Sequence, residues 1–151
     1  MSGRVSLHRA ERQITIAASP EICFATASDY AAFPDWQDAV IAVDVLERDG
    51  DGRGELVEFV ADAKIREVRY RLRYHHEPPQ RIWWEFVEGD GVANIEGEYL
   101  FVAKANDTLV TYRLGIDPGV PVPGLIVRRA NSTVMKRSME DLRAEAERRA
   151  G

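Results

Sequence analysis

Residues Pro123–Arg149 read PGLIVRRANSTVMKRSMEDLRAEAERR, and this stretch predicts how the rest of the chain is organised. After Gly124 it contains no proline or glycine. Its apolar or small residues recur mostly three or four positions apart, at Val127, Ala130, Asn131, Val134, Met135, Ser138, Met139, Leu142 and Ala146. This spacing is typical of one face of an α-helix. A helix of roughly 25 residues is about 40 Å long, and it needs a large partner surface because burial of its apolar face supplies most of its stability.

The segments that precede this helix supply such a surface, because apolar and polar residues alternate in them as in β-strands. We predict strands over Glu11–Ala18, Val40–Arg48, Glu55–Ala61, Ile65–Tyr74, Arg81–Glu88, Ile95–Phe101 and Val110–Ile116. Turns are predicted at Asp49–Gly54 and at Gly89–Gly91, where glycine and aspartate cluster. A run of strands at short spacing, with the helices outside the run, predicts an antiparallel sheet and the α+β class.

Two short helices are predicted between the first and second strands. Ser19 is a good N-cap, and Pro20 suits the first helical position. Ser28 and Asp29 can cap a second helix over Tyr30–Phe33, which Pro34 is expected to stop. We therefore interpret Asp29, and likewise Asp35, as capping residues.

Composition bounds the class of protein. The 151 residues are 45% hydrophobic and 30% charged, as in ordinary soluble globular proteins, and they suit one domain over residues 11–150 behind an N-terminal extension of residues 1–10. A net charge of −5 disfavours nucleic-acid binding, which needs a basic face. Cys23 is the only cysteine, so an intrachain disulfide is excluded. We see neither a signal peptide nor a membrane-spanning run, and we expect a cytoplasmic protein without stable membrane insertion.

The two faces of the predicted sheet differ sharply. One face carries charge, and neighbouring strands place opposite charges together: Glu58, Arg69, Arg71, Arg73, Glu85, Glu98 and Arg113. The other face is aromatic: Phe59, Tyr70, Tyr74, Trp84, Phe86, Tyr99, Phe101 and Tyr112. These rings either fill a solid core or border an apolar cavity, and periodicity does not separate the two alternatives.

The chain resembles the START-like helix-grip superfamily, also called SRPBCC, in its polyketide cyclase/dehydrase and lipid-transport branch. The resemblance covers Glu11–Arg149. It is carried by I-x-A-x-P-E-x-x-F at residues 16–24, D-Y-x-x-F-P-D-W at 29–36, T-L-V-T-Y at 108–112 and P-x-P-G-L at the entry to the last helix. It implies a helix-grip fold, in which a curved seven-stranded antiparallel sheet wraps around the long C-terminal helix.

The resemblance also implies a small hydrophobic ligand, such as a lipid, a polyketide or another aromatic or isoprenoid molecule, held between sheet and helix by a carrier or sensor. Two alternatives stay open: a polyketide aromatase/cyclase or dehydratase that uses cavity tyrosines, and a protein-interaction module. No cofactor is expected, and the protein is expected to be a monomer or homodimer. The candidate ligand-binding residues are Phe59, Tyr70, Leu72, Trp84, Phe86, Tyr99, Tyr112, Asn131, Met135, Met139 and, near one end of the cavity, Trp36.

No residue pattern assigns catalysis. The sequence lacks nucleophile, zinc-protease and phosphate-loop motifs. His75 and His76 are adjacent, so in a strand they face opposite ways, and we expect exposed side chains rather than a metal pair. Asn131 is predicted either to orient a polar group of the ligand or to bond a tyrosine hydroxyl. Arg66 can reach one rim of the aromatic face, and Arg128 and Arg129 are expected in the first turn of the last helix.

Overall fold

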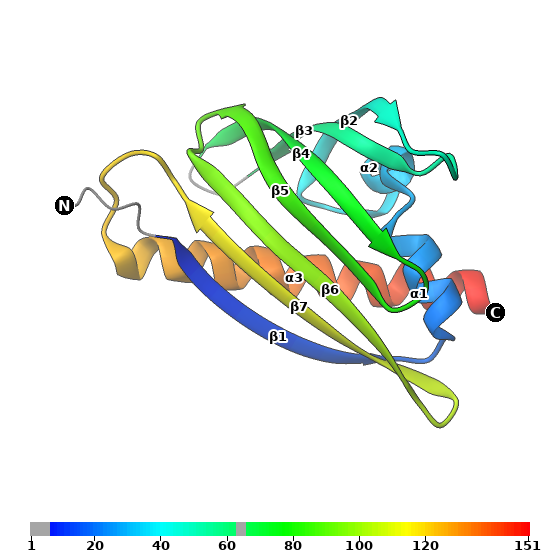
Figure 1. The fold of residues 1–151 in the computed structure, drawn as a ribbon. Coiled ribbons are helices and arrows are strands. Elements are labelled where there is room, and N and C mark those ends of the chain that lie inside the picture. Colours follow the sequence, from blue (N-terminus) through cyan, green and yellow to red (C-terminus); the bar gives the residue numbers. More distant parts are fainter. Residues whose placement is uncertain (1–6, 63–65) are drawn as a thin grey trace.

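The structure is a computed structural model that describes residues 7–62 and 66–151 (Figure 1). The strands within those residues are β1 His8–Ile16, β2 Val40–Arg48, β3 Gly54–Asp62, β4 Glu67–Glu77, β5 Arg81–Asp90, β6 Asn94–Lys104 and β7 Asp107–Asp117. The helices are α1 Pro20–Ala27, the 3-10 helix η1 Tyr30–Ala32, α2 Phe33–Trp36 and α3 Gly124–Ala150. The predicted α+β class and the order of elements are confirmed.

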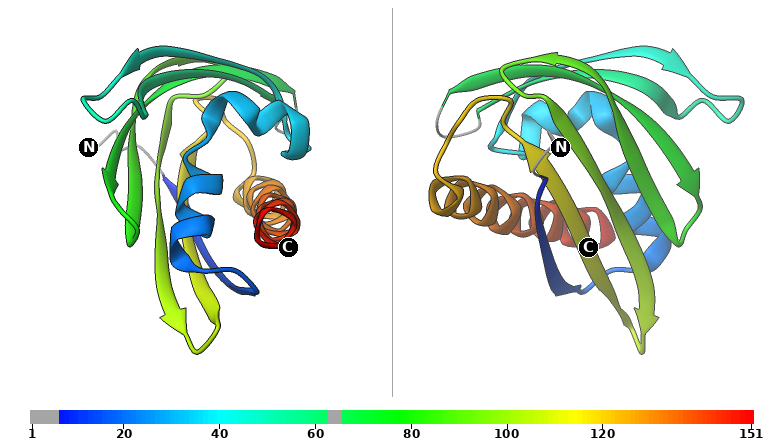
Figure 2. Two further views of the ribbon diagram at one scale, coloured as in Figure 1. Left: turned by 90° about the vertical axis from the view of Figure 1, so that its right-hand side faces the viewer. Right: turned by 60° about the vertical axis from the view of Figure 1, so that its left-hand side comes forward.

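The seven described strands form one antiparallel sheet in the order β1-β7-β6-β5-β4-β3-β2. Figure 2 shows that this sheet curves around α3, with the short helices closing one end of the enclosed space. The helix-grip arrangement is therefore confirmed. One ladder is much shorter than the others: β5 and β6 pair only over Arg81–Trp84 and Gly97–Leu100. Beyond these residues β5 continues beside β4, and β6 continues beside β7.

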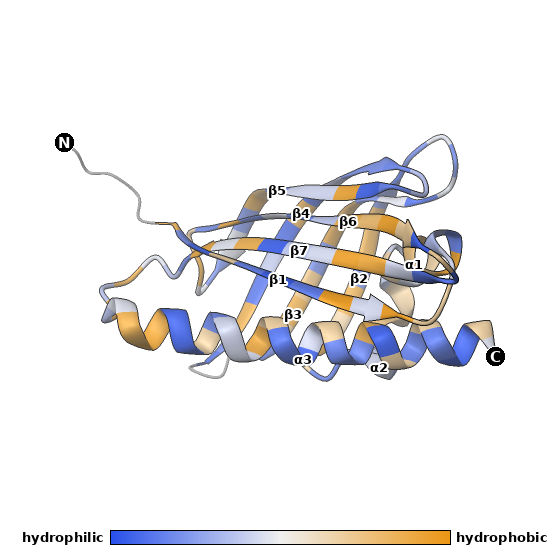
Figure 3. Ribbon diagram, turned by 90° about the horizontal axis from the view of Figure 1, so that it is seen from below, coloured by the Kyte–Doolittle hydropathy of each residue, from blue (hydrophilic) through white to orange (hydrophobic). Residues whose placement is uncertain are grey.

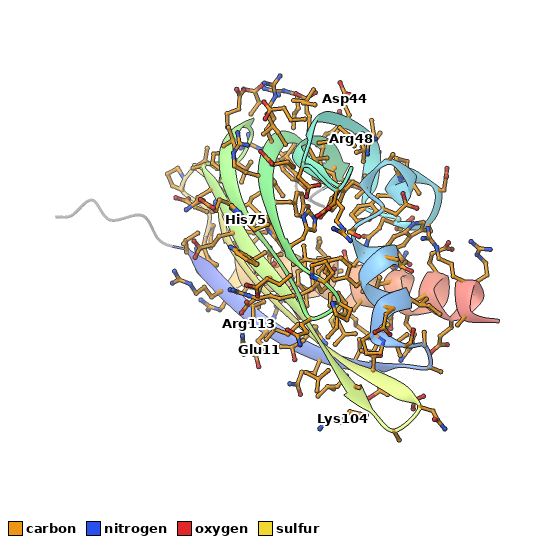
Figure 4. All side chains as sticks on the ribbon, turned by 45° about the vertical axis from the view of Figure 1, so that its right-hand side comes forward. Glu11, Asp44, Arg48, His75, Lys104 and Arg113 are labelled. Carbon is orange, nitrogen blue, oxygen red and sulfur yellow. The ribbon has the colours of Figure 1, made fainter. Side chains whose placement is uncertain are left out.

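The outer face of the sheet is covered by ion pairs between neighbouring strands. Glu58 on β3 accepts hydrogen bonds from Arg69 and Arg71 on β4 at 2.8 and 2.9 Å, and the bond from Arg71 is the main reason why the pKa of Glu58 is lowered. Arg113 on β7 donates to Glu11 on β1 at 2.6 Å, and Figure 4 shows these two side chains beside each other. This confirms the predicted charge pairing. Each exposed pair is worth less than about 1 kcal/mol.

The C-terminal half of α3 is fixed to the rest of the molecule by polar contacts. Glu147 accepts a hydrogen bond from the backbone N–H of Ala17 at 2.8 Å, and Asp141 accepts one from the N–H of Asp38 at 2.8 Å. Arg149 pairs with Asp29 at 3.0 Å. Hydrogen bonds from Arg148 and Arg149 lower the pKa of Glu145 to about 2, so this carboxylate stays charged. We call the three contacts that Glu147, Asp141 and Arg149 make outside the helix the α3 clamp.

Some predicted boundaries and roles are wrong. Residues 8–10, expected in the N-terminal extension, form the first rungs of the β1–β7 ladder. Pro34 does not stop a helix but lies in the first turn of α2, where the missing N–H costs no hydrogen bond. The side chain of Asp29 caps no helix, because it pairs with Arg149 instead. Residues 1–6 of the predicted extension and the predicted strand start at Ile65 lie outside the described residues.

The predicted turn at Gly89–Gly91 begins later than expected. Gly89 lies within β5 opposite Tyr70, and a Cβ at Gly89 would lie 2.8 Å from the carbonyl oxygen of Arg69. The glycine is thus needed for the close approach of β4 and β5, whereas Gly91, with φ of 89°, makes the turn.

Gly97 on β6 gives a sharp test of this packing. A Cβ at Gly97 would lie 2.5 Å from both the indole ring of Trp84 and the carbonyl oxygen of Arg113. We therefore expect Gly97→Ala to lower the free energy of unfolding by roughly 1–3 kcal/mol, as overpacking does. Urea unfolding followed by circular dichroism measures this change.

The matched control is Gly115→Ala on the neighbouring strand β7. Its added Cβ would meet only the flexible side chains of Arg9 and Glu96, at 3.4 Å. This control is expected to unfold within about 0.5 kcal/mol of the wild type, as substitutions away from packed features do. Equal stability of the two variants would contradict the placement of Trp84 over Gly97.

Candidate functional site

A pocket of about 200 Å³ lies between the concave face of the sheet and the N-terminal half of α3. Strands β3 to β7 provide its aromatic wall, and α3 closes it with Val127, Ala130, Asn131, Val134 and Ser138. These helix positions are three or four apart, so they form one stripe. The pocket extends to the β3–β4, β5–β6 and β7–α3 connections, which contribute Arg66, Val92 and Val120 among others. The α3 clamp lies at the other end of the helix.

Most of the predicted ligand-binding residues lie together at this pocket. Those that border it are Phe59, Tyr70, Leu72, Trp84, Tyr99, Tyr112 and Asn131. Met135 and Met139 do not border it; they are almost completely buried in the core. Phe86 does not border it either, because it lies where β5 and β6 part. Trp36 packs against Phe33, a pocket residue, with ring centroids 5.0 Å apart. Contact of all eleven with a ligand stays a prediction.

Sequence reasoning missed several residues that border the pocket. The period-two pattern placed Tyr74 on the same aromatic face as Tyr70, although Tyr74 was not among the candidate ligand-binding residues. Gln37, Val120 and Val122 lie in connections between elements, where no periodic signal exists. Arg66 lies at the pocket as expected, and it donates a hydrogen bond to the carbonyl oxygen of Gly91 at 2.9 Å.

Four tyrosine hydroxyls are the main polar groups of the wall, those of Tyr70, Tyr74, Tyr99 and Tyr112. Within residues 7–62 and 66–151 they have no hydrogen-bond partner, whereas the hydroxyl of Tyr30, outside the pocket, bonds His76 at 2.8 Å. Burial raises the pKa of Tyr70 to about 12 and those of Tyr74, Tyr99 and Tyr112 well above the ordinary value. These groups therefore stay neutral and can donate hydrogen bonds at physiological pH.

Two of these tyrosines form a stacked pair. Tyr99 and Tyr112 are directly opposite on β6 and β7, and their ring centroids are 4.5 Å apart with planes inclined by 22°. Both side chains leave the same face of the sheet from paired positions. The wall thus presents two neutral donors on neighbouring strands.

Asn131 is the polar residue that α3 buries most deeply at the pocket, with 4% of its surface exposed. Its Nδ2 donates a hydrogen bond to the backbone carbonyl of His8 at 3.3 Å. Its Oδ1 is buried and has no partner among the described residues. The alternative that Asn131 bonds a tyrosine hydroxyl is therefore wrong.

The two adjacent histidines lie away from the pocket. They face opposite sides of β4 as predicted: His75 pairs with Glu85 on the outer face, and His76 Nε2 bonds the Tyr30 hydroxyl. The expectation that His76 is exposed is wrong, because only 4% of its side chain is accessible. Burial lowers its pKa, against the effect of Asp49 at 3.7 Å. No three acidic, histidine or cysteine side chains in the described ranges are grouped to hold a metal ion.

The groups that border the pocket can bind and orient a molecule. The charged residues that border it are Asp62 and Arg66, both at its rim and both exposed. The wall itself carries neutral hydroxyls, the amides of Gln37 and Asn131, and hydrocarbon groups. General acid–base catalysis is most effective with a group that titrates near neutral pH, and the described wall offers none.

Comparison with known proteins agrees with this geometry. Residues 8–147 match the sequence model of a family described as "Polyketide cyclase / dehydrase and lipid transport". A START superfamily protein from Mycobacterium smegmatis has a TM-score of 0.86 and 21% identity, covering 93% of this chain and 98% of that one. The Zhui aromatase/cyclase from Streptomyces sp. R1128 has a TM-score of 0.79 and 18% identity, covering 97% of each chain. No curated protein sequence matches the chain. Among the described helices, none has the length and apolar character to cross a membrane.

The raised tyrosine pKa values give a direct prediction. All 5 tyrosines of the chain are buried enough that ionisation is disfavoured. We expect the folded protein to show almost no tyrosinate absorbance at 295 nm near about pH 10.5, whereas the protein unfolded in urea titrates near the ordinary value of about 10.

The raised tyrosine pKa values also determine how the free energy of unfolding changes with pH. A pKa that is higher in the folded state favours folding below the ordinary tyrosine pKa of about 10, and this contribution is lost as pH rises towards the folded value. The free energy of unfolding should thus fall above about pH 10. Ionisation of most tyrosines near pH 10 in the folded protein would contradict their burial.

Proposed function

The chain belongs to the polyketide cyclase/dehydrase and lipid transport family, and on that premise we propose that it binds a small hydrophobic molecule in the pocket beneath α3, as a carrier or sensor. The observation that carries this proposal is the wall itself: it is aromatic and aliphatic, and its polar groups include neutral hydroxyls and the amides of Gln37 and Asn131. Small-molecule sites are built in this way, with an apolar surface and a few polar groups that fix orientation.

The size of the pocket narrows the class of ligand. Its volume of about 200 Å³ lies below the roughly 300–1,000 Å³ of drug-sized sites. A compact molecule of one or two rings suits it better than a whole acyl chain. Any longer part of a ligand would have to extend past the rim, where Val120 offers exposed apolar surface. Figure 3 shows that the nearby N-terminal end of α3 is also hydrophobic, and Leu125 and Ile126 there are about half exposed.

A second candidate function is that of an aromatase/cyclase or dehydratase. It is supported by the structural similarity to the Zhui aromatase/cyclase and by the Tyr99–Tyr112 pair, whose neutral hydroxyls can donate to a ketone oxygen. It is the weaker candidate, because such a reaction also needs a base, and the described wall contains no group that titrates near neutral pH. Turnover of a poly-β-ketone mimic that is lost in Tyr99→Phe would favour it over the carrier.

The test of binding is to fill the pocket from the helix. Val134 borders the pocket, so Val134→Phe places a ring in the space that the ligand needs. We expect isothermal titration of the wild type with 2-naphthol, a compact two-ring probe, to give saturable binding at one site per chain. The variant should bind at least about tenfold more weakly, since it loses most of the apolar contact.

The matched control is Thr133→Phe. This neighbouring residue is exposed on the outer side of α3, so the same ring added there should leave the affinity unchanged. The proposal would be contradicted if Val134→Phe bound 2-naphthol with wild-type affinity. It would also be contradicted if the wild type showed no saturable binding to any of a panel of one- and two-ring aromatic molecules.

A further inference from the structure

The amide of Asn131 is held in one orientation. A backbone carbonyl can only accept a hydrogen bond, so the contact with His8 at 3.3 Å requires the Nδ2 side of the amide. The Oδ1 must then face the other way. The residues four positions away on either side of the same helix are Val127 and Met135, which offer no side-chain donor.

The carbonyl oxygen of this amide is consequently left without a donor. It is buried and unpaired among the described residues, although a buried amide oxygen normally has a hydrogen bond. The tyrosine hydroxyls across the pocket are donors, but none of them bonds it. Asn131 borders the pocket, so a molecule in the pocket is the candidate donor for this oxygen.

Resting on the proposed function, we infer that the ligand carries a hydroxyl or N–H group that donates a hydrogen bond to Oδ1 of Asn131. The ligand class is therefore a compact ring compound with a donor, such as a phenol or a cyclic alcohol, and Asn131 selects it over a hydrocarbon, an ether or an ester of the same shape. Binding sites that pair a buried polar group with the ligand reject analogues that lack the matching group, because that buried group is then left unpaired.

The position of the donor on the ligand follows from the fold. Asn131 lies on α3, on the side of the pocket opposite the sheet, whereas Tyr99 and Tyr112 lie on the sheet. The ring of the ligand would thus lie against the aromatic wall, with its donor directed towards the helix. An acceptor elsewhere on the same ligand would meet the tyrosine hydroxyls.

Two probes of nearly equal size test whether a hydrogen-bond donor on the ligand strengthens binding. 2-Naphthol carries a donor, and 2-fluoronaphthalene has the same rings without one. We expect isothermal titration to show that the wild type binds 2-naphthol about fivefold to tenfold more tightly, the value of one hydrogen bond to a buried group. In Asn131→Leu, which keeps the side-chain size but removes the amide, this preference should disappear.

The control variant is Met135→Leu, one turn along the same helix, where the side chain is buried but does not border the pocket. It should retain the preference for 2-naphthol. Thermal unfolding verifies that each variant is folded, and the comparison of the two probes with the wild type needs no variant at all.

Each outcome has one meaning. Equal binding of the two probes to the wild type overturns the inference but leaves the proposed function standing; a water molecule that satisfies Asn131 would give this result. A preference that persists in Asn131→Leu also overturns it and assigns recognition to the tyrosines. Binding of neither probe overturns the proposed function itself.

Discussion

The structure depends on how one straight helix is held against a curved sheet. The α3 clamp fixes the C-terminal half of the helix through Glu147, Asp141 and Arg149, which contact the end of β1 and the segments around the short helices. The core beneath that half is closed by Met139, Leu142 and Ala146. Figure 2 shows that the sheet curves around this helix. The pocket lies between the concave face of the sheet and the N-terminal half of α3.

The two faces of the sheet differ in the chemistry of their side chains. The outer face pairs its charges between neighbouring strands, as Arg69 and Arg71 do with Glu58. The inner face is aromatic, and its tyrosine hydroxyls are left to the pocket. Low dielectric and the absence of partners make these hydroxyls neutral donors rather than bases. The chemistry of the site is thus set by burial more than by any single motif.

Local patterns predicted what depends on local periodicity. The alternation in Ile65–Tyr74 and the helical stripe of Pro123–Arg149 predicted the strands, the long helix and the charge pairing. The local patterns did not predict the surroundings of side chains that are buried by residues far away in the chain. His76 is covered by Tyr30, which is 46 residues away in the chain. Asn131 bonds His8 across 123 residues. The stripe on α3 likewise did not reveal that Val134 borders the pocket while Met135 lies in the core, because that depends on how the helix is rotated against the sheet.

The short ladder between β5 and β6 has a mechanical consequence. Strands β2 to β5 form one panel and β6, β7 and β1 form another, and the backbone bonds that join them run only over Arg81–Trp84 and Gly97–Leu100. The pocket wall takes Tyr70 and Leu72 from the first panel and Tyr99 and Tyr112 from the second. A change in the angle between the two panels would therefore alter the width of the pocket while leaving the hydrogen-bond ladders within each panel intact.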